Sequence, residues 1–284
     1  MPVALVTDST ASLPADVAAA RDVTVVPLQV VIGATSYDEG VEGGATAEML
    51  AEALQAWTPV STSRPNPDEM LDVYERLATD GATEVVSVHL SGELSGTYES
   101  AQLAARKAPV PVLTVDSRQV GMGTGFAVLA AADARDAGGD ASAVAAAARR
   151  RVSTTTSLFY VDTLEYLRRG GRVGATAALV GSALAVKPIL RIDDGRVVPF
   201  ERVRTAGKAL HRLEELAVEA AGSAPVDVAV AHLASWDRAA ALTGRLSERL
   251  AGGLEGRPVH LGEIGAVLGA HVGPGMVAVS VARR

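Results

Sequence analysis

The sequence predicts an α/β protein of two domains, and three observations support this prediction. Apolar runs rich in β-branched residues alternate with helical patterns throughout residues 1–151, which is typical of a doubly wound, mostly parallel sheet. Lys187–Ile192 and Val197–Val203 read as strands joined by an Asp194–Gly195 turn, so residues 152–284 should form an α/β domain with a mixed or antiparallel sheet. A chain of 284 residues with 48% hydrophobic residues can bury both cores.

The first elements alternate as this fold class requires. Val3–Thr7 reads as a buried strand, and Val23–Val31 reads as a second strand in which Pro27 indicates an edge, a bulge or an end. Residues 33–44 form a glycine-bearing segment that we expect to be a loop. Thr46 can cap the next helix, which should run to Trp57, and we expect that tryptophan in the core.

Prolines divide the next segment. Pro59–Pro67 cannot continue a helix, so we expect a loop that exposes the hydroxyl of Thr62. Asn66, Pro67 and Glu69 then have the pattern of a helix start, with a cap, a first position and a third position. This helix should run to about Thr79.

Residues 85–107 are the most informative stretch, because a buried strand pattern passes through a Ser/Gly loop into a helix pattern. Ser95, Gly96 and Thr97 fall where the strand's carboxyl end meets the first helical turn. Unpaired amides and the helix dipole favour an anion at such a point. The Ser95 hydroxyl can donate to a carboxylate or phosphate oxygen. The alternative is that Ser95 or Gly96 only caps the helix.

The remaining pattern continues to alternate, and its last helix precedes His271. We expect His271 on a loop that enters a strand, where an imidazole can face a cleft. The predicted strands are Pro111–Val115, Val226–Leu233, Pro258–Leu261 and Met276–Ala282, and the predicted helices are Gly121–Ala137, Asp140–Arg151, Ala206–Ala221 and Trp236–Leu250. Ile264–Ala270 reads as a short helix or a turn.

Composition excludes several classes of protein. A formal charge of −7 argues against general nucleic-acid binding, and the absence of cysteine excludes disulfides and thiolate chemistry. The first residues lack a signal-peptide pattern, and the longest apolar run, 175–186, is shorter than the roughly 20 residues of a membrane span, so we expect a cytoplasmic protein. Residues 165–208 carry nine Lys or Arg against four Asp or Glu. This basic segment would suit an anionic group or an acidic partner, and the alternative is a solvated, arginine-rich surface.

Histidine and serine side chains are the candidates for metal binding and catalysis in this sequence. The five histidines show no metal-site spacing, so we expect no metal centre, and His89 and His232 should be core residues of strands. A Ser95 and His271 pair with Asp116 or Glu263 as the acid would suit an acyl hydrolase or transferase. The residues ELSGT around Ser95 lack the GxSxG pattern of a nucleophile elbow, which argues against this alternative.

Several motifs together resemble one family, the DegV proteins, which are the fatty-acid-binding subunits of bacterial fatty acid kinase. The resemblance runs from the first strand to the last. Two departures are Arg64, where the family usually has Gln, and Ala278, where Gly is common. The motifs are TDST (7–10), VVPLQV (25–30), STSRPNP (61–67), LSGTYESA (94–101), VDS (115–117), TLEYLRRGGRVG (163–174), VKPIL (186–190), ERVRT (201–205) and HVGPG (271–275).

The resemblance implies a carrier that is not catalytic alone. Such proteins hold one long-chain fatty acid between two α/β domains and present its carboxylate to a separate kinase, which phosphorylates it with ATP. No cofactor is implied beyond the bound fatty acid. The family's carboxylate-binding residues match Thr62, Ser95 and His271. Three arginines would lie near the head group or on the kinase-docking face: Arg172, Arg202 and Arg204.

Overall fold

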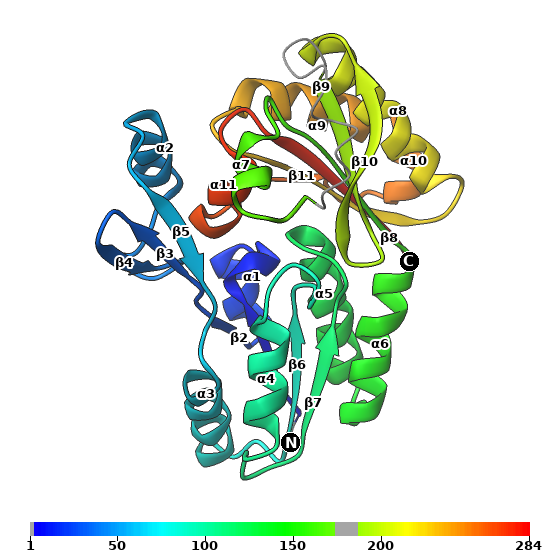
Figure 1. The fold of residues 1–284 in the computed structure, drawn as a ribbon. Helices are drawn as coiled ribbons and strands as arrows, with labels where there is room; N and C mark the ends of the chain where they lie inside the picture. Colours follow the sequence, from blue (N-terminus) through cyan, green and yellow to red (C-terminus); the bar gives the residue numbers. More distant parts are fainter. Residues whose placement is uncertain (1–2, 174–186) are drawn as a thin grey trace.

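The computed structural model describes residues 3–173 and 187–284, and these residues form an α/β structure (Figure 1). A four-stranded sheet lies at one end, a six-stranded sheet lies at the other, and a three-stranded sheet lies beside them. The apolar run 175–186 falls outside the described residues. Within the described residues, no helix has the length and apolar character that crossing a membrane requires.

The four-stranded sheet is parallel and has helices on both faces, as the sequence predicts. Its elements are β1 (Val3–Asp8), η1 (Ser9–Ala11), α1 (Ala15–Ala20), β2 (Val23–Val26), α3 (Pro67–Thr79), β6 (Glu84–His89), α4 (Thr97–Ala105), β7 (Val112–Asp116), α5 (Met122–Asp136) and α6 (Ala141–Ser153). The strand order is β2-β1-β6-β7, and Leu5 of β1 lies opposite both Val23 and Val86. One core packs the sheet against α1, α5 and α6, and another packs it against α3 and α4.

A buried chain of hydrogen bonds joins the two central strands of this sheet. His89 Nδ1 lies 2.9 Å from Asp8 Oδ2, and His89 Nε2 lies 2.7 Å from the Ser87 hydroxyl, which also accepts from Tyr74. All four side chains are fully buried, so His89 is a core histidine, as predicted. Because Asp8 also accepts the Leu90 amide at 3.1 Å, the same carboxylate fixes the start of the loop after β6.

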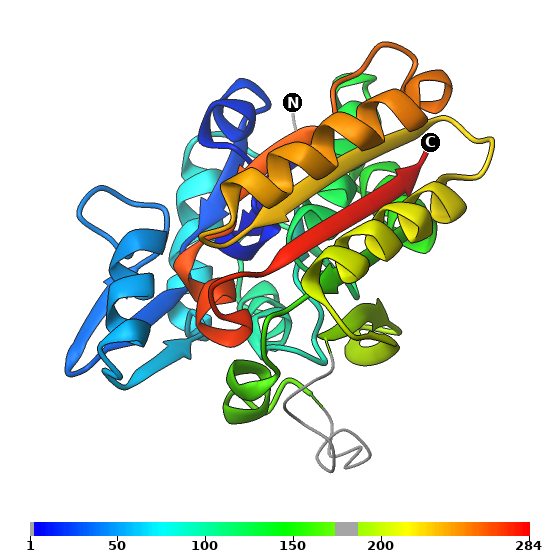
Figure 2. The same ribbon diagram turned by 90° about the horizontal axis from the view of Figure 1, so that it is seen from above.

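The six-stranded sheet is mixed, which confirms the prediction for the second half of the chain. Its elements are β8 (Thr155–Tyr160), α7 (Glu165–Arg169), β9 (Lys187–Asp193), β10 (Arg196–Val203), α8 (Ala206–Ala221), β11 (Val226–His232), α9 (Trp236–Arg249), α10 (Ala251–Leu254), β12 (His260–Glu263), α11 (Ala266–Val272) and β13 (Val277–Arg283). The order is β10-β9-β8-β13-β11-β12, and only β11 and β12 among these neighbours are parallel. Figure 2 shows α8 and α9 on the outer face of the sheet.

The two halves of the chain divide between these sheets. Helix α6 ends at Ser153 and packs on the first sheet, whereas β8 begins at Thr155 and pairs within the second. The predicted turn is present, with φ of 48° at Asp194 and 80° at Gly195. The domain limits 1–151 and 152–284 stay a prediction.

The three-stranded sheet corrects the prediction for residues 23–67. It contains β3 (Gln29–Ile32), β4 (Thr35–Asp38) and β5 (Val60–Ser63), with α2 (Ala47–Gln55) beside it. The predicted strand 23–31 is broken after Val26, and its two parts enter different sheets. Segments 33–44 and 59–67, predicted as loops, contribute strands β4 and β5, because β3 pairs with both in antiparallel register.

Trp57 is exposed, so its predicted place in the core is wrong. Helix α2 begins at the predicted cap, with the Met49 amide donating to Thr46 at 3.2 Å, and it ends at Gln55. Trp57 follows with a φ of 56°, and its side chain is 79% exposed. The Arg169 guanidinium lies 5.7 Å from the centre of the indole ring.

Candidate functional site

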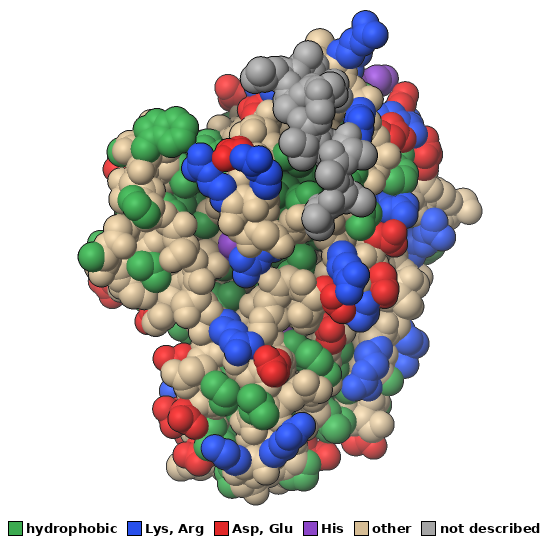
Figure 3. Space-filling view, viewed as in Figure 1, with side chains coloured by type: hydrophobic (Ala, Val, Ile, Leu, Met, Phe, Trp, Pro, Cys, Tyr) green, Lys and Arg blue, Asp and Glu red, His purple; other side chains and the backbone are tan. Residues whose placement is uncertain are grey.

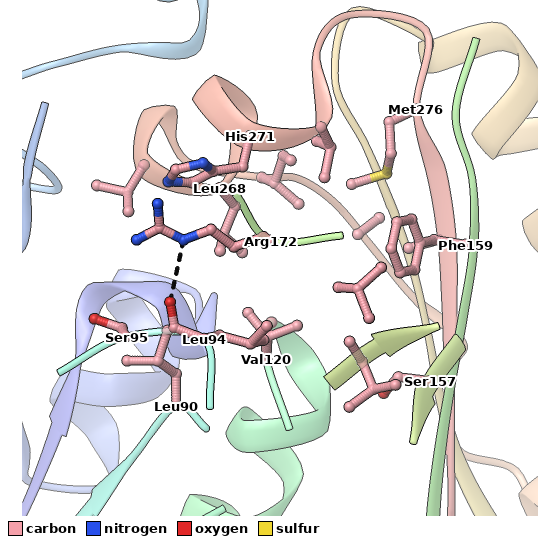
Figure 4. Close-up of a pocket in the computed structure, with 18 of the residues that line it drawn as sticks. Leu90, Leu94, Ser95, Val120, Ser157, Phe159, Arg172, Leu268, His271 and Met276 are labelled. Carbon is pink, nitrogen blue, oxygen red and sulfur yellow. Dashed lines mark hydrogen bonds between the residues drawn. The ribbon is translucent and has the colours of Figure 1, made fainter. Parts of the chain in front are cut away.

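A cavity of about 450 Å³ lies where the three sheets meet. Its walls are mostly apolar and come from distant parts of the chain, including Leu90 and Val120 from the first half and Phe159, Leu268 and Met276 from the second (Figure 4). Pockets of this size and character are typical of small-molecule sites. Because the walls come from both halves of the chain, the site exists only when the two halves are packed together.

Thr62 and His271 meet at one end of this cavity. The Thr62 Oγ1 atom lies 2.9 Å from His271 Nε2, although the residues are 209 positions apart. Their local structure differs from the prediction, because Thr62 lies on β5, opposite Val30 of β3, and His271 lies in the last turn of α11. That helix ends at Gly273, whose φ of 73° suits a residue without a side chain.

The environment of His271 keeps its imidazole neutral. Burial, together with the smaller effect of the nearby positive charge of Arg172, lowers the pKa of His271 to about 4. A Cβ atom on Gly170 would lie 2.4 Å from His271 Nδ1, so this position admits the imidazole only because it is glycine. The ring therefore presents Nε2 to Thr62.

Ser95 lies at the same end of the cavity, on the loop before α4. Its hydroxyl is 2.9 Å from the Thr97 hydroxyl and accepts the Thr97 amide at 3.3 Å. The local capping interpretation is thus correct as far as Ser95 satisfies one free amide, although the helix cap itself is Gly96. The exposure of Ser95 to the cavity leaves this hydroxyl available to a ligand oxygen as well.

Two arginines add positive charge to this polar end. Arg172 lines the cavity and donates from Nε to the Leu94 carbonyl at 3.2 Å, the bond drawn in Figure 4. Arg64 also lines it and donates to the Gly96 carbonyl and to Glu99, each at 2.9 Å. The departure from the resemblance at position 64 therefore places a guanidinium beside the Ser95 loop.

Arg202 and Arg204 do not line the cavity. Arg202 lies near the end of β10 and Arg204 follows it, and both are exposed. Figure 3 shows Lys and Arg side chains spread over one face of the molecule, with Asp and Glu side chains among them. Gly170 was not predicted as part of the site, although the GG pair of RRGGRV is a signal for a close approach of this kind.

The alternative acids for a catalytic triad are engaged elsewhere. Asp116 accepts the Arg118 amide at 2.7 Å, and Glu263 accepts the Ala234 amide at 2.9 Å. Among the residues the structure describes, no group of three or more His, Asp or Glu side chains is placed to hold a metal ion. His232 is buried in its strand, as predicted, although its Nε2 lacks a hydrogen-bond partner there.

Comparison with known proteins identifies the family. The family model described as "Uncharacterised protein, DegV family" matches residues 2–284. The chain belongs to the DegV family. A DegV domain-containing protein of Streptomyces coelicolor is 53% identical over 282 residues, which cover 99% of each chain.

Two solved structures of DegV proteins share the whole fold. A fatty-acid-binding DegV family protein from Thermus thermophilus is 34% identical, with a TM-score of 0.91 and 100% of both chains covered. DegV from Bacillus subtilis, a fatty acid binding protein, is 32% identical, with a TM-score of 0.89 and the same coverage. These matches confirm the resemblance and the two-part α/β fold class.

Proposed function

We propose that this DegV protein binds one long-chain fatty acid, with the acyl chain in the cavity and the carboxylate at Thr62, Ser95 and His271. The observation that carries the proposal is one apolar cavity with a polar, cationic end, where Thr62 and His271 lie 2.9 Å apart. The fatty-acid-binding proteins of T. thermophilus and B. subtilis support it, because they share the fold over their full length.

The two ends of the cavity would contribute differently to binding. Burial of an alkyl chain gives about 0.8 kcal/mol per methylene, so a sixteen-carbon tail supplies at most about 12 kcal/mol before the costs of association. Hydrogen bonds to a carboxylate give about 1.5–3 kcal/mol each, and they mainly offset the loss of its hydration. Affinity should therefore come from the tail, and the orientation of the carboxylate from the polar residues.

We also propose that a separate kinase phosphorylates the bound carboxylate with ATP, so that the chain acts as a carrier and needs no cofactor of its own. The Ser95 hydroxyl pairs with Thr97, and His271 pairs with Thr62, so these side chains are arranged to hold a carboxylate. Arg202 and Arg204 are exposed near the end of β10, at the edge of the six-stranded sheet, where a partner protein can reach them. They are the proposed docking residues.

Native mass spectrometry of the purified protein tests the binding proposal. We expect a non-covalent adduct with the mass of a long-chain fatty acid. If the purified protein carries no adduct and also fails to load after incubation with fatty acid, the carrier function is excluded. Turnover of an acyl ester, or a covalent acyl group on Ser95, would favour the hydrolase alternative.

A kinase-coupled assay tests the roles of the polar residues. Ser95→Ala or Thr62→Ala should reduce loading by less than about tenfold, because each removes one hydrogen bond, but should reduce acyl-phosphate formation more strongly. Thr79→Ala is the matched control, since its exposed hydroxyl only bonds the Glu75 carbonyl within α3. Wild-type phosphorylation by the Ser95→Ala protein would remove Ser95 from the proposed site.

A further inference from the structure

The end of the cavity away from Ser95 and Arg172 is not wholly apolar. Ser157 of β8 and Ser280 of β13 lie directly opposite each other in the antiparallel register, and both line the cavity. Figure 4 shows Ser157 on the side of the cavity opposite Ser95. The two side chains are buried, with exposures of 5% and 7%, and their hydroxyl oxygens are 3.2 Å apart.

The hydrogen-bonding capacity of this pair is only partly used. Two hydroxyls carry two protons, and the bond between Ser157 and Ser280 uses one of them. Among the described residues, neither hydroxyl has another side-chain partner, so one donor is left over in a largely apolar wall. A donor that is buried against an alkyl chain loses its hydrogen bonds to water and gains no other hydrogen bond, which is unfavourable.

Gln119 lies behind the serine pair and does not line the cavity. Gln119 is 6% exposed, and its Oε1 atom is buried with no hydrogen-bond partner in the described part of the chain. The point where a Cβ atom would stand on Gly123 lies 2.7 Å from the Ser157 hydroxyl and 2.9 Å from Gln119 Oε1. A side chain at this position would clash with both atoms, so glycine lets helix α5 pack close behind the serine pair.

We propose that this end of the cavity is a subsite for a hydroxyl group on the distal half of the acyl chain, so that the protein prefers a hydroxy fatty acid to the plain chain of equal length. A hydroxyl accepts from the spare donor of the serine pair and donates to a serine oxygen, so both of its hydrogen-bonding roles are used. A keto group only accepts, so it satisfies the spare donor alone. This inference rests on the proposed fatty-acid function.

Competition binding with defined fatty acids tests the subsite. The probes are stearic acid, its isomers with one hydroxyl at each position of the distal half, and the isomer with the hydroxyl beside the carboxylate. We expect at least one distal isomer to bind wild-type protein about tenfold more tightly than stearic acid, which corresponds to about 1.4 kcal/mol. The isomer with the hydroxyl beside the carboxylate should show no such preference.

Variants of the serine pair show whether that preference comes from the subsite. In Ser157→Ala/Ser280→Ala, and in Ser280→Ala alone as the milder change, the ratio of distal-isomer to stearic-acid affinity should fall about tenfold. Ser100→Ala, a buried serine of α4 outside the cavity lining, should keep the wild-type ratio. Thermal unfolding of each variant establishes that it is folded.

The outcomes separate this inference from the proposed function. If stearic acid binds but no distal isomer binds more tightly, as expected when water fills the subsite, the inference is wrong and the carrier function stands. A preference that persists in the double variant also overturns it. If none of the fatty acids binds, the proposed function fails and the inference fails with it.

Discussion

Acid titration of His271 provides a direct test of the site geometry. The pKa of this imidazole is about 4 in the folded protein, against about 6.5 for an unfolded chain. Between these values the unfolded chain binds more protons, so the stability that the neutral, buried imidazole contributes is complete above about pH 6.5 and is lost as the pH falls toward 4. Because a shift of one pKa unit corresponds to 1.36 kcal/mol, the loss amounts to at most about 3 kcal/mol.

Urea unfolding of wild type and His271→Gln across this pH range measures the effect. The difference between the two proteins isolates His271, since their other titrating groups are shared. We expect the wild type to lose up to about 3 kcal/mol relative to the variant between pH 6.5 and pH 4. A flat difference curve, or one with the opposite slope, would refute the buried, neutral imidazole. A bound carboxylate favours the charged form, so added fatty acid should reduce the slope.

Two further predictions concern a close approach in the site and a buried hydrogen bond between a histidine and an aspartate. Gly170→Ala places a Cβ atom within 2.4 Å of the site imidazole and should weaken fatty-acid binding about tenfold, whereas Gly207→Ala meets no atom within 4 Å and should bind normally in the same titration. Equal affinities would show that the imidazole can move freely. His89→Leu removes a hydrogen-bond partner, at 2.9 Å, from the buried Asp8 carboxylate and should cost about 1–3 kcal/mol in urea unfolding. His211→Leu, at an exposed helix position, should change stability by less than about 0.5 kcal/mol, and a similar small change for His89→Leu would contradict the prediction.

Features that depend on local sequence were predicted well. The helix start at Asn66 is an example, because the side chain accepts the Glu69 amide at 2.9 Å and Glu69 accepts the Asn66 amide in return. Residues three apart determine that bond, so the pattern is visible in the sequence. The Asp194–Gly195 turn and the position of Ser95 before α4 are local in the same sense.

Features that depend on distant contacts were not predicted. Pro59 and Pro65 flank Thr62 and suggest a loop, but pairing with β3, about thirty residues earlier, makes the segment a strand. Trp57 is a large apolar residue of a type that is usually buried. Leu50 lies on the buried face of α2, however, and the helix ends before it reaches the tryptophan. The cavity itself has no sequence signal, because apolar residues look alike whether they face a ligand or the core.

The three-stranded sheet has a consequence for how the protein is made. Its apolar residue Val30 shares a core cluster with Phe159, Leu190 and Ile192 of the six-stranded sheet. A ribosome adds about 5–20 residues per second, so those early strands wait on the order of ten seconds before their packing partners emerge. During that interval the nascent chain exposes the apolar side of this sheet to water. A chaperone that binds this apolar surface would protect the protein from aggregation until synthesis is complete.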